Sequence, residues 1–233
     1  MSVEVVTLNG EVGAGESVLA AARRVLDGSG YAGHDPWAVD LTADPVRLAA
    51  GDGVTLAYRP MTTADLGDLV RWQRAPHAVR WFRGESLDPA TAGERYGPQL
   101  RGEAPTRMWV LEVAGRSVGY LQDYRVRDHD EYAAKVGDPE AVAFDYLIGD
   151  RSLVGRGLGT RVVWTFCRDV LRRDYPDAPR FVASPDHRNA ISLRVLAKCG
   201  FAEGLWIDVP GQDHPEVVCT LDVAQVLGRV TRG

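Results

Sequence analysis

The stretch 142–160 constrains this chain most, because it joins a short apolar run to a set of alternating glycines. The run 142–148 is partly β-branched and is closed by Gly149-Asp150, which predicts a buried strand. Glycines at positions 155, 157 and 159 then open an amphipathic pattern, which predicts a helix that begins near Leu158. Exposed backbone N–H groups at glycines and at a helix N-terminus can bind a pyrophosphate, although an ordinary strand-to-helix turn has a similar composition.

Two common phosphate-binding motifs do not fit this stretch. The dinucleotide fingerprint needs the spacing G-x-G-x-x-G, whereas the glycines here alternate. A P-loop needs a lysine before its final Ser or Thr, and Gly159 stands directly before Thr160.

The remaining pattern predicts a mixed α+β domain. Strands are expected at 54–58, 108–113, 117–124, 180–183, 205–209 and 217–223, and helices at 63–73, 90–100, 158–173 and 189–199. The polar stretch 127–139 is interpreted as a surface excursion. The sequence therefore divides into an N-terminal extension at 1–53, with one plausible helix at 16–26, a domain at 54–223, and a tail at 224–233.

Composition excludes several classes of protein. The net charge of −5 argues against a nucleic-acid partner, and no apolar stretch approaches the roughly 20 residues of a membrane span. The N-terminus lacks the pattern of a secretory signal. Cys167, Cys199 and Cys219 are odd in number and have apolar neighbours, which favours buried thiols in the cytoplasm over disulfides or a metal site.

Several ordered segments resemble one known family. The glycine pattern is similar to the pyrophosphate loop R/Q-x-x-G-x-G/A of the GCN5-related N-acetyltransferases (GNAT), with Val154 at the first place and Gly157 and Gly159 as the two glycines. The segments HAVRWFRGE, VGYLQDY, FDYLIGD, LVGRGLGT, PDHRN and LAKCGF together resemble the aminoglycoside 6′-N-acetyltransferase branch. The resemblance covers about 54–223 and implies a mostly antiparallel sheet that is splayed open in its middle, flanked by helices.

The resemblance implies acetyl-CoA as the acyl donor. It assigns the backbone of Leu147 and Ile148 to the thioester and pantetheine, and the side chain of Asn189 to the pantetheine arm, although Asn189 also fits a helix cap. The pyrophosphate would bind the loop of Val154, Gly155, Arg156, Gly157, Leu158, Gly159 and Thr160.

Asp145 is the candidate catalytic residue. An acid within an apolar strand is costly unless it is paired or faces a cleft, and an ion pair with a nearby arginine is the structural alternative. The resemblance implies that Asp145 meets the amine that is acetylated. Because its ordinary pKa of ~3.9 is far below that of an amine, Asp145 is expected to bind the ammonium and to accept a proton only as the tetrahedral intermediate forms.

The acceptor is expected to be a cationic amine. Candidate acceptor-binding residues are Trp81, Phe82, Glu85, Gln122, Tyr124, Asp145, Ser184 and Asp213, although Trp81 fits a core position equally well. A surplus of surface carboxylates at 128–140 would attract a polycation. Two departures from the family pattern matter: Leu196 stands where a tyrosine commonly protonates the thiolate, and Ser184 stands where close relatives carry an acid.

Other readings stay open. The acceptor can instead be a siderophore hydroxylamine, a polyamine or a protein amine, and the chain can be a non-catalytic acyl-CoA-binding domain. A monomer and a homodimer fit the sequence equally.

Overall fold

The computed structural model describes residues 55–81, 88–155, 157–209 and 214–227, with two short strands nearer the N-terminus. These strands, β1 (Val6–Leu8) and β2 (Val39–Leu41), pair in parallel and form a sheet of their own. The helix predicted at 16–26 lies outside the described residues.

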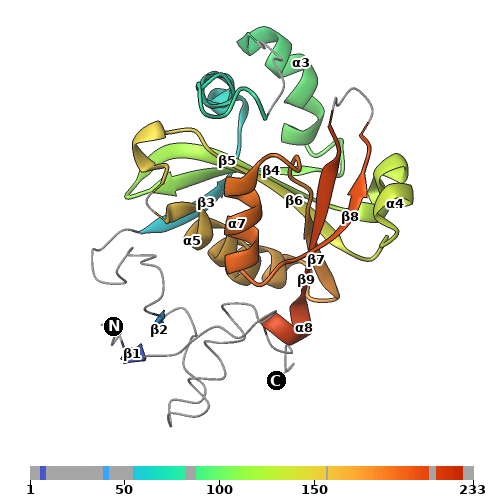
Figure 1. Cartoon of the computed structure of the whole chain (residues 1–233). Helices are drawn as coiled ribbons and strands as arrows, with labels where there is room; N and C mark the ends of the chain where they lie inside the picture. The colour runs from blue at the N-terminus through green and yellow to red at the C-terminus, as the bar shows by residue number, and fades with distance from the viewer. Residues whose placement is uncertain are drawn as a thin grey trace.

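The main sheet has seven strands in the order β3-β4-β5-β6-β7-β9-β8 (Figure 1). Neighbours are antiparallel except β6 and β7, which are parallel, so the predicted mixed and mostly antiparallel sheet is confirmed. The strands are β3 (Leu56–Pro60), β4 (Arg107–Val113), β5 (Arg116–Arg125), β6 (Val142–Ile148), β7 (Arg180–Ala183), β8 (Ala202–Ile207) and β9 (Glu216–Asp222).

Strand bounds follow the sequence pattern closely in the middle of the sheet and less well at its edges. β6 and β7 match the predicted ranges, and the tight turn between β4 and β5 places Ala114 and Gly115 at positive φ. β3 lies two residues later than predicted, and β8 begins three residues earlier, at Ala202. Edge strands are bounded by fewer buried neighbours, so alternation in the sequence defines their ends poorly.

Helices cover both faces of the sheet. The elements are η2 (Thr63–Asp65), α2 (Leu66–Gln73), α3 (Pro89–Leu100), η3 (Val126–Asp128), α4 (Asp130–Val136), η4 (Arg151–Leu153), α5 (Leu158–Thr165), α6 (Arg172–Asp174), α7 (Ala190–Lys198) and α8 (Val223–Val226), with a π-helical segment η5 (Phe166–Leu171) between α5 and α6. The four helices predicted from the sequence are confirmed, the longest as the continuous α5-η5-α6 unit.

The stretch 127–139 lies at the surface, as expected, but the sequence analysis did not predict the helix α4 that forms within it. Tyr132, Ala133 and Val136 lie on one face of α4 and pack on a buried cluster that includes Ala143 and Val182. One turn of apolar residues at spacing i, i+1 and i+4 is too short to stand out within a polar segment.

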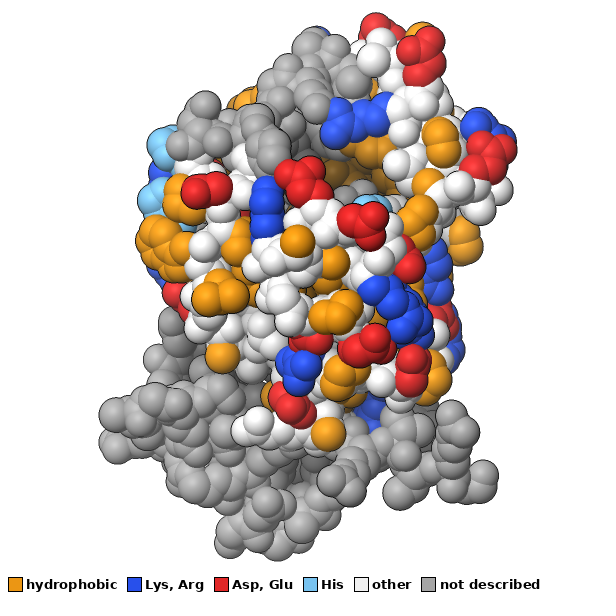
Figure 2. Space-filling view, turned by 90° about the vertical axis from the view of Figure 1, so that its right-hand side faces the viewer, with side chains coloured by type: hydrophobic (Ala, Val, Ile, Leu, Met, Phe, Trp, Pro, Cys, Tyr) orange, Lys and Arg blue, Asp and Glu red, His pale blue; other side chains and the backbone are white. Residues whose placement is uncertain are grey.

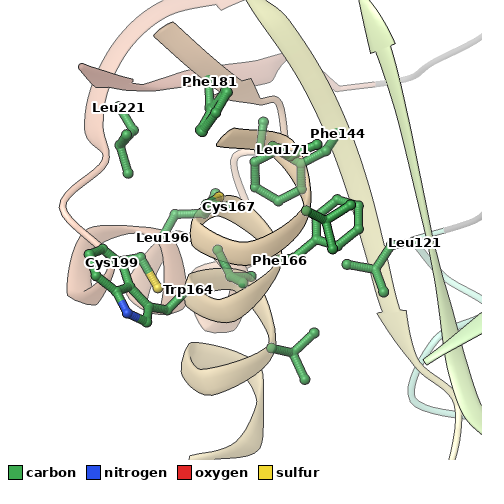
Figure 3. Packing of buried hydrophobic residues seen from close by; sticks show 14 of the residues in the cluster. Leu121, Phe144, Trp164, Phe166, Cys167, Leu171, Phe181, Leu196, Cys199 and Leu221 are labelled. Carbon is green, nitrogen blue, oxygen red and sulfur yellow. The ribbon is translucent and has the colours of Figure 1, made fainter. Parts of the chain in front are cut away.

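The largest core cluster lies between the sheet and the α5-η5 and α7 helices (Figure 3). Phe144 on β6, Phe166 on η5 and Phe181 on β7 are fully buried there, and the rings of Phe144 and Phe166 lie 6.1 Å apart. All three cysteines are buried free thiols, as predicted. A second cluster packs α2 and α3 on the opposite face of β4, β5 and β6.

Strand β6 separates from β7 in the middle of the sheet. Their pairing consists of Val142 with Phe181 and Ala143 with Val182, whereas β6 pairs with β5 along its whole length. On the β5 side the contact is very close at Gly119, because a Cβ there would lie 2.0 Å from the carbonyl oxygen of Leu147. The second half of β6 is therefore held by β5 and borders a gap on its β7 side.

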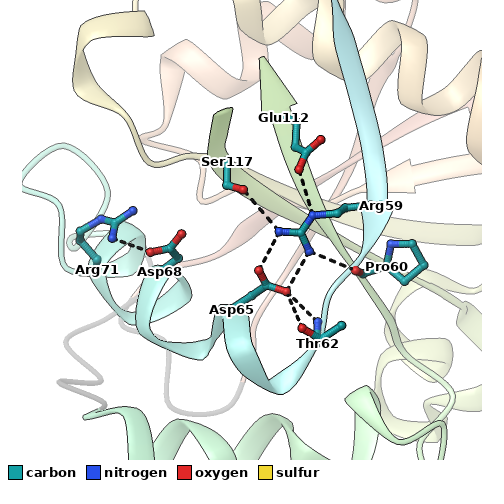
Figure 4. Close-up of polar contacts among 8 residues, drawn as sticks. All are labelled: Arg59, Pro60, Thr62, Asp65, Asp68, Arg71, Glu112 and Ser117. Carbon is teal, nitrogen blue, oxygen red and sulfur yellow. Dashed lines mark hydrogen bonds and ion pairs between the residues drawn. The ribbon is translucent and has the colours of Figure 1, made fainter. Parts of the chain in front are cut away.

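The entry to α2 is fixed by an arginine network (Figure 4). Arg59 donates to both carboxylate oxygens of Asp65, at 2.7 and 2.9 Å, and its Nε donates to Glu112 at 2.9 Å. The same carboxylate accepts from the backbone N–H and the hydroxyl of Thr62, each at 2.9 Å. The Arg59 guanidinium holds the pKa of Asp65 at about 2, so this cap remains charged over the physiological range.

Candidate active site

Asp145 lies at the point where β6 leaves β7. It is directly opposite Gln122 on β5, and the Gln122 amide donates to Asp145 Oδ2 at 2.7 Å. Within the described residues no arginine or lysine forms an ion pair with Asp145, so the alternative of an arginine-paired strand aspartate finds no support there. Burial raises the pKa of the Asp145 carboxyl, and the bond from Gln122 partly opposes that shift.

The side chains around Asp145 come from one face of the sheet. Neighbouring residues in a strand point to opposite faces, and Ala143, Val182 and Val218 all belong to the cluster under α4. Side chains two positions away along a strand, or directly opposite on the paired strand, share that face. The polar ones are Gln122, Tyr124, Asp145, Ser184 and Glu216. Three of the predicted acceptor residues, Gln122, Tyr124 and Ser184, are therefore brought to the face of Asp145.

Tyr132 of α4 completes this acceptor cluster, which we define as Gln122, Tyr124, Tyr132, Asp145, Ser184 and Glu216. Its hydroxyl hydrogen-bonds the Ser184 hydroxyl at 2.7 Å, and its ring lies 5.9 Å from that of Tyr124. Figure 2 shows the α4 side of the molecule, where a hollow with hydrophobic side chains at its floor is rimmed by acidic and basic side chains.

Sequence reasoning did not find Tyr132 or Glu216. Tyr132 was missed because its segment was interpreted as a polar surface excursion. Only recognition of Tyr132, Ala133 and Val136 as one helical face would have predicted its contact with the sheet. Glu216 lies just before the strand predicted at 217–223. In the structure it begins β9 and forms an antiparallel β-bridge with Asp186.

Of the other four predicted acceptor residues, Trp81 alone is among the described residues. Phe82, Glu85 and Asp213 lie outside the described residues, as does Arg156 of the glycine loop. Trp81 is half-buried, and the Arg80 guanidinium lies 4.6 Å from its ring centroid. Nothing in the described residues joins Trp81 to the acceptor cluster.

The glycine loop has the backbone that its composition predicts. Gly155 and Gly157 have φ values of +81° and +77°, a region that side chains with a Cβ rarely adopt. Gly157 is the N-cap of α5, followed by Leu158, Gly159 and Thr160 in the first helical turn, with Val154 extended just before the loop. The N–H groups of this turn are thus available for an anion, which fits a pyrophosphate.

The far end of β6 is held by a histidine that the sequence did not single out. His77 Nε2 lies 2.8 Å from the carbonyl oxygen of Ile148, so this nitrogen carries the proton and donates. The other nitrogen, Nδ1, is buried and has no hydrogen-bond partner among the described residues. Leu147 is buried against the α2 cluster and Ile148 packs on the α5 cluster, so their side chains serve the core, as predicted.

Asn189 caps α7, as predicted, by accepting from the N–H of Ser192 at 3.1 Å. The Ser192 hydroxyl hydrogen-bonds the Tyr146 hydroxyl on β6 at 2.8 Å, which ties the start of α7 to the splayed half of β6. Leu196, at the place of the family tyrosine, is fully buried in the core and cannot donate a proton.

The expected surplus of acidic surface is largely neutralised locally. Asp138 pairs with Arg180, Glu140 with Arg127, and Glu131 with Lys135. Asp128 and Asp130 are exposed beside them. Pairing within the surface weakens the long-range attraction that the sequence suggested for a polycation.

The described residues contain neither a metal-binding group nor a membrane-spanning helix. They hold no group of three or more histidine, cysteine, aspartate or glutamate side chains placed to bind a metal. None of their helices has the length and apolar character needed to cross a membrane.

Comparison with known proteins places the chain among acetyltransferases. The model of the acetyltransferase (GNAT) domain family matches residues 61–209. The aminoglycoside N(6′)-acetyltransferase type 1 of Klebsiella pneumoniae is 30% identical over 187 residues, which are 79% of this chain and 90% of the relative. Its counterpart from Serratia marcescens is 30% identical over 171 residues, 72% of this chain and 82% of the relative.

Two solved structures that are similar to this chain are also of an aminoglycoside acetyltransferase. The crystal structure of aminoglycoside acetyltransferase AAC(6′)-Ib with coenzyme A superposes with a TM-score of 0.66 at 25% identity, over 76% of this chain and 99% of that one. The same score and coverage hold for its complex with coenzyme A and kanamycin.

Proposed function

Because the chain belongs to the GNAT acetyltransferase family, we propose that it transfers the acetyl group of acetyl-CoA to a primary amine of an aminoglycoside, with the 6′-amine as the target. The observation that supports this most is the half-buried carboxylate of Asp145 at the gap between β6 and β7, facing a polar cluster and held by a neutral amide. GNAT enzymes use acetyl-CoA, and the glycine loop at the start of α5 has the free backbone donors that its pyrophosphate needs.

Residues on the two sides of the gap have different roles in the proposed acetyl transfer. The loop at Gly155–Thr160 and the cap residue Asn189 hold the acyl donor on the side of α5 and α7. The backbone N–H of Ile148, beyond the last residue pair with β7, would polarise the thioester carbonyl. The N–H of Leu147 points to β5 instead, on the same side as the Gly149 N–H that donates to the Val118 carbonyl. His77 fixes this end of β6 through the Ile148 carbonyl.

Asp145 acts on the acceptor. Its carboxylate binds the ammonium form and orients the nitrogen toward the thioester. The ammonium first loses one proton to solvent, which frees the lone pair that attacks the thioester carbonyl. As the N–C bond forms, the nitrogen of the tetrahedral intermediate becomes acidic, and Asp145 accepts its second proton directly or through a water molecule. Burial raises the pKa of this carboxyl and so makes it a better base than an exposed aspartate. The C–S bond then breaks, and the thiolate takes its proton from solvent, because Leu196 has none to give.

The test is regiochemical. Kanamycin and its 6′-hydroxy analogue are each incubated with acetyl-CoA and the full chain, with thiol release as the rate and mass spectrometry and NMR of the products. We expect release with kanamycin, a product acetylated at the 6′-nitrogen, and little release with the analogue. Equal acetylation of both would remove the 6′-amine as the target, and release with a polyamine or a hydroxylamine alone would change the acceptor.

A role in antibiotic resistance follows from this proposal. Acetylation removes the positive charge of the amine, so the product binds anionic partners more weakly. Expression of the chain in a susceptible bacterium should raise the inhibitory concentration of kanamycin, and the Asp145→Asn variant should not.

A further inference from the structure

A pair of hydroxyl groups joins β6 to α7 on the side of the sheet where the acyl donor is proposed to bind. Tyr146 lies next to Asp145 on the splayed half of β6, and its ring packs on the α5-η5 and α7 core, 6.3 Å from the ring of Phe144. Its hydroxyl lies 2.8 Å from the hydroxyl of Ser192 in the first turn of α7. Both residues are half-buried, so the pair lies at the border of the core.

The pair carries one hydroxyl proton more than its own hydrogen bond uses. Two hydroxyl groups have two protons, and the bond between them takes one. Among the residues that the structure describes, neither the Tyr146 nor the Ser192 hydroxyl makes a hydrogen bond to a further acceptor. Because polar groups that are removed from water normally find a partner, the second proton is available to a ligand.

A similar pair of hydroxyls on the same side of the sheet has no such proton to spare. Tyr58 on β3 lies 2.6 Å from the Thr165 hydroxyl of α5. Tyr58 also donates to the Val162 carbonyl at 2.8 Å, and Thr165 donates to the Arg161 carbonyl at 2.7 Å. The backbone of α5 therefore takes up the protons of this pair, which makes it a structural counterpart of the pair on β6 and α7.

The available proton belongs to Ser192. A phenol, with a pKa of ~10, is a stronger donor and a weaker acceptor than an aliphatic hydroxyl, so Tyr146 donates to Ser192. Accepting this bond polarises the Ser192 O–H, since hydrogen bonds in a chain strengthen one another. The Ser192 N–H donates to Asn189 Oδ1 at 3.1 Å, so this side of α7 also carries the residue expected to hold the pantetheine arm.

We propose that the Ser192 hydroxyl donates a hydrogen bond to the sulfur of the acyl donor as the C–S bond breaks, and that Tyr146 positions and polarises this hydroxyl. This role rests on the proposed function and adds a group that assists the departure of the thiolate, because Leu196 cannot. The electron pair of the C–S bond goes to sulfur, and the hydrogen bond stabilises the negative charge that develops there. Ser192 is thus a catalytic residue, and Tyr146 is a positioning residue.

The pair supplies a hydrogen bond and keeps its protons. Burial raises the pKa of the Tyr146 hydroxyl far above that of a thiol, which is ~8.5 for cysteine in water. Ionisation of the phenol is therefore much less favourable than formation of the thiolate. The thiolate leaves with its charge, and solvent supplies the proton that completes the product thiol.

The test measures the ionisation of coenzyme A in its complex with the full chain. The ultraviolet absorbance of the thiolate, titrated against pH, gives the pKa of the bound thiol without turnover. A hydrogen bond to the thiolate lowers that pKa. We expect Ser192→Ala to raise it by about one unit or more and Tyr146→Phe to raise it by less.

Two variants serve as controls for this titration. Ser192→Thr keeps the hydroxyl and should keep the wild-type pKa of the bound thiol. Thr165→Ala removes one hydroxyl of the counterpart pair, at a matched position between sheet and helix. It should also titrate as the wild type, since that pair has no proton for a ligand.

Reaction rates test the same contact during turnover. With kanamycin and acetyl-CoA, Ser192→Ala should lower kcat about tenfold or more, as for the loss of a hydrogen bond to a charged group, while KM for kanamycin is nearly kept. In the Ser192→Ala background, Tyr146→Phe should cause no further loss, because Tyr146 acts only through Ser192.

The titration and the rates separate this inference from the proposed function. If the bound thiol has the same pKa in the wild type and in Ser192→Ala, the role of Ser192 is wrong, whether or not kanamycin is acetylated. If the pKa shifts as expected and the wild type does not acetylate kanamycin, the contact to sulfur stands and the proposed acceptor is wrong.

Discussion

Replacement of Asp123 by alanine should destabilise the domain strongly, although Asp123 does not face the acceptor. Asp123 lies on β5 between Gln122 and Tyr124 and points to the opposite face of the sheet, where it is fully buried. Its carboxylate accepts from Arg107 Nε at 2.8 Å, Trp109 Nε1 at 2.6 Å and the Tyr175 hydroxyl at 2.6 Å. Alanine leaves these three donors without their acceptor.

The expected loss in free energy of unfolding depends on which acceptors each donor keeps. Removing one partner of a buried ion pair costs about 3–5 kcal/mol, because the other charge remains buried. The Arg107 side chain is 37% exposed and keeps a second acceptor in Asp174, at 2.8 Å. Solvent therefore screens its charge in part, and the loss is expected at the lower end, at most about 3 kcal/mol. For a chain of this size each kcal/mol lowers Tm by roughly 2–4 °C, which gives a fall of about 6–12 °C.

Thermal and urea unfolding, followed by circular dichroism, measure this loss. Asp123→Asn keeps one acceptor oxygen and the side-chain volume, so its loss should be smaller than that of alanine. Asp169→Ala is the matched control, because Asp169 pairs with Arg168 at an exposed site, and its Tm should stay near wild type. If Asp123→Ala and Asp169→Ala unfold at the same temperature, the network around Asp123 does not stabilise the fold as argued.

Two further substitutions, one of them with two readouts, test the site itself. Gly157→Asp should abolish acetyl-CoA binding in calorimetry while the fold persists. The φ of +77° disfavours a residue with a Cβ, so the loop backbone shifts, and the added carboxylate repels the pyrophosphate. Unchanged affinity in a folded variant would contradict the assignment of the loop. Asp145→Asn should lower kcat/KM for the acceptor and leave the affinity for acetyl-CoA nearly unchanged, whereas a wild-type kcat/KM would remove Asp145 from catalysis. The raised pKa of Asp145 means that its ionisation above that pKa costs folding free energy, so Asp145→Asn should unfold at a higher temperature than wild type near pH 7. That gain should shrink as pH falls toward the ordinary aspartate pKa of ~3.9, and a gain that does not vary with pH would point to packing instead.

The central part of the fold could be predicted because its signals are local. The run Val142–Ile148 is apolar and closed by Gly149, and the glycines that follow force a particular backbone at the start of α5. Asp145 stands out because burying an acid among apolar residues costs free energy unless the acid is paired or faces a cleft. Each of these arguments uses residues a few positions apart, where sequence and structure agree most directly.

Sequence analysis did not predict Tyr132 and Glu216, because contacts between segments far apart in the sequence bring them into the acceptor cluster. Tyr132 reaches the sheet only because α4 packs over β6 and β7, and a single turn of apolar spacing does not identify such a helix in advance. Glu216 lies on the same face of the sheet as Asp145 only because of the register of β9 against the segment at Pro185. A shift of one residue in that register would turn Glu216 to the other face, so its role cannot be assigned before the pairing is known.

The alternation of side chains along β6 fits the proposal that one strand serves two substrates. Phe144, Tyr146 and Ile148 face α5 and α7, where the acyl donor is proposed to bind, and Tyr146 reaches Ser192 beside the cap residue Asn189. Asp145 faces the acceptor cluster on the other side. Because β6 parts from β7 after Ala143, the two faces meet through the gap rather than being sealed by sheet hydrogen bonds. The thioester and the amine can then approach from opposite faces, and the strand that separates them also carries the residue proposed to accept the proton.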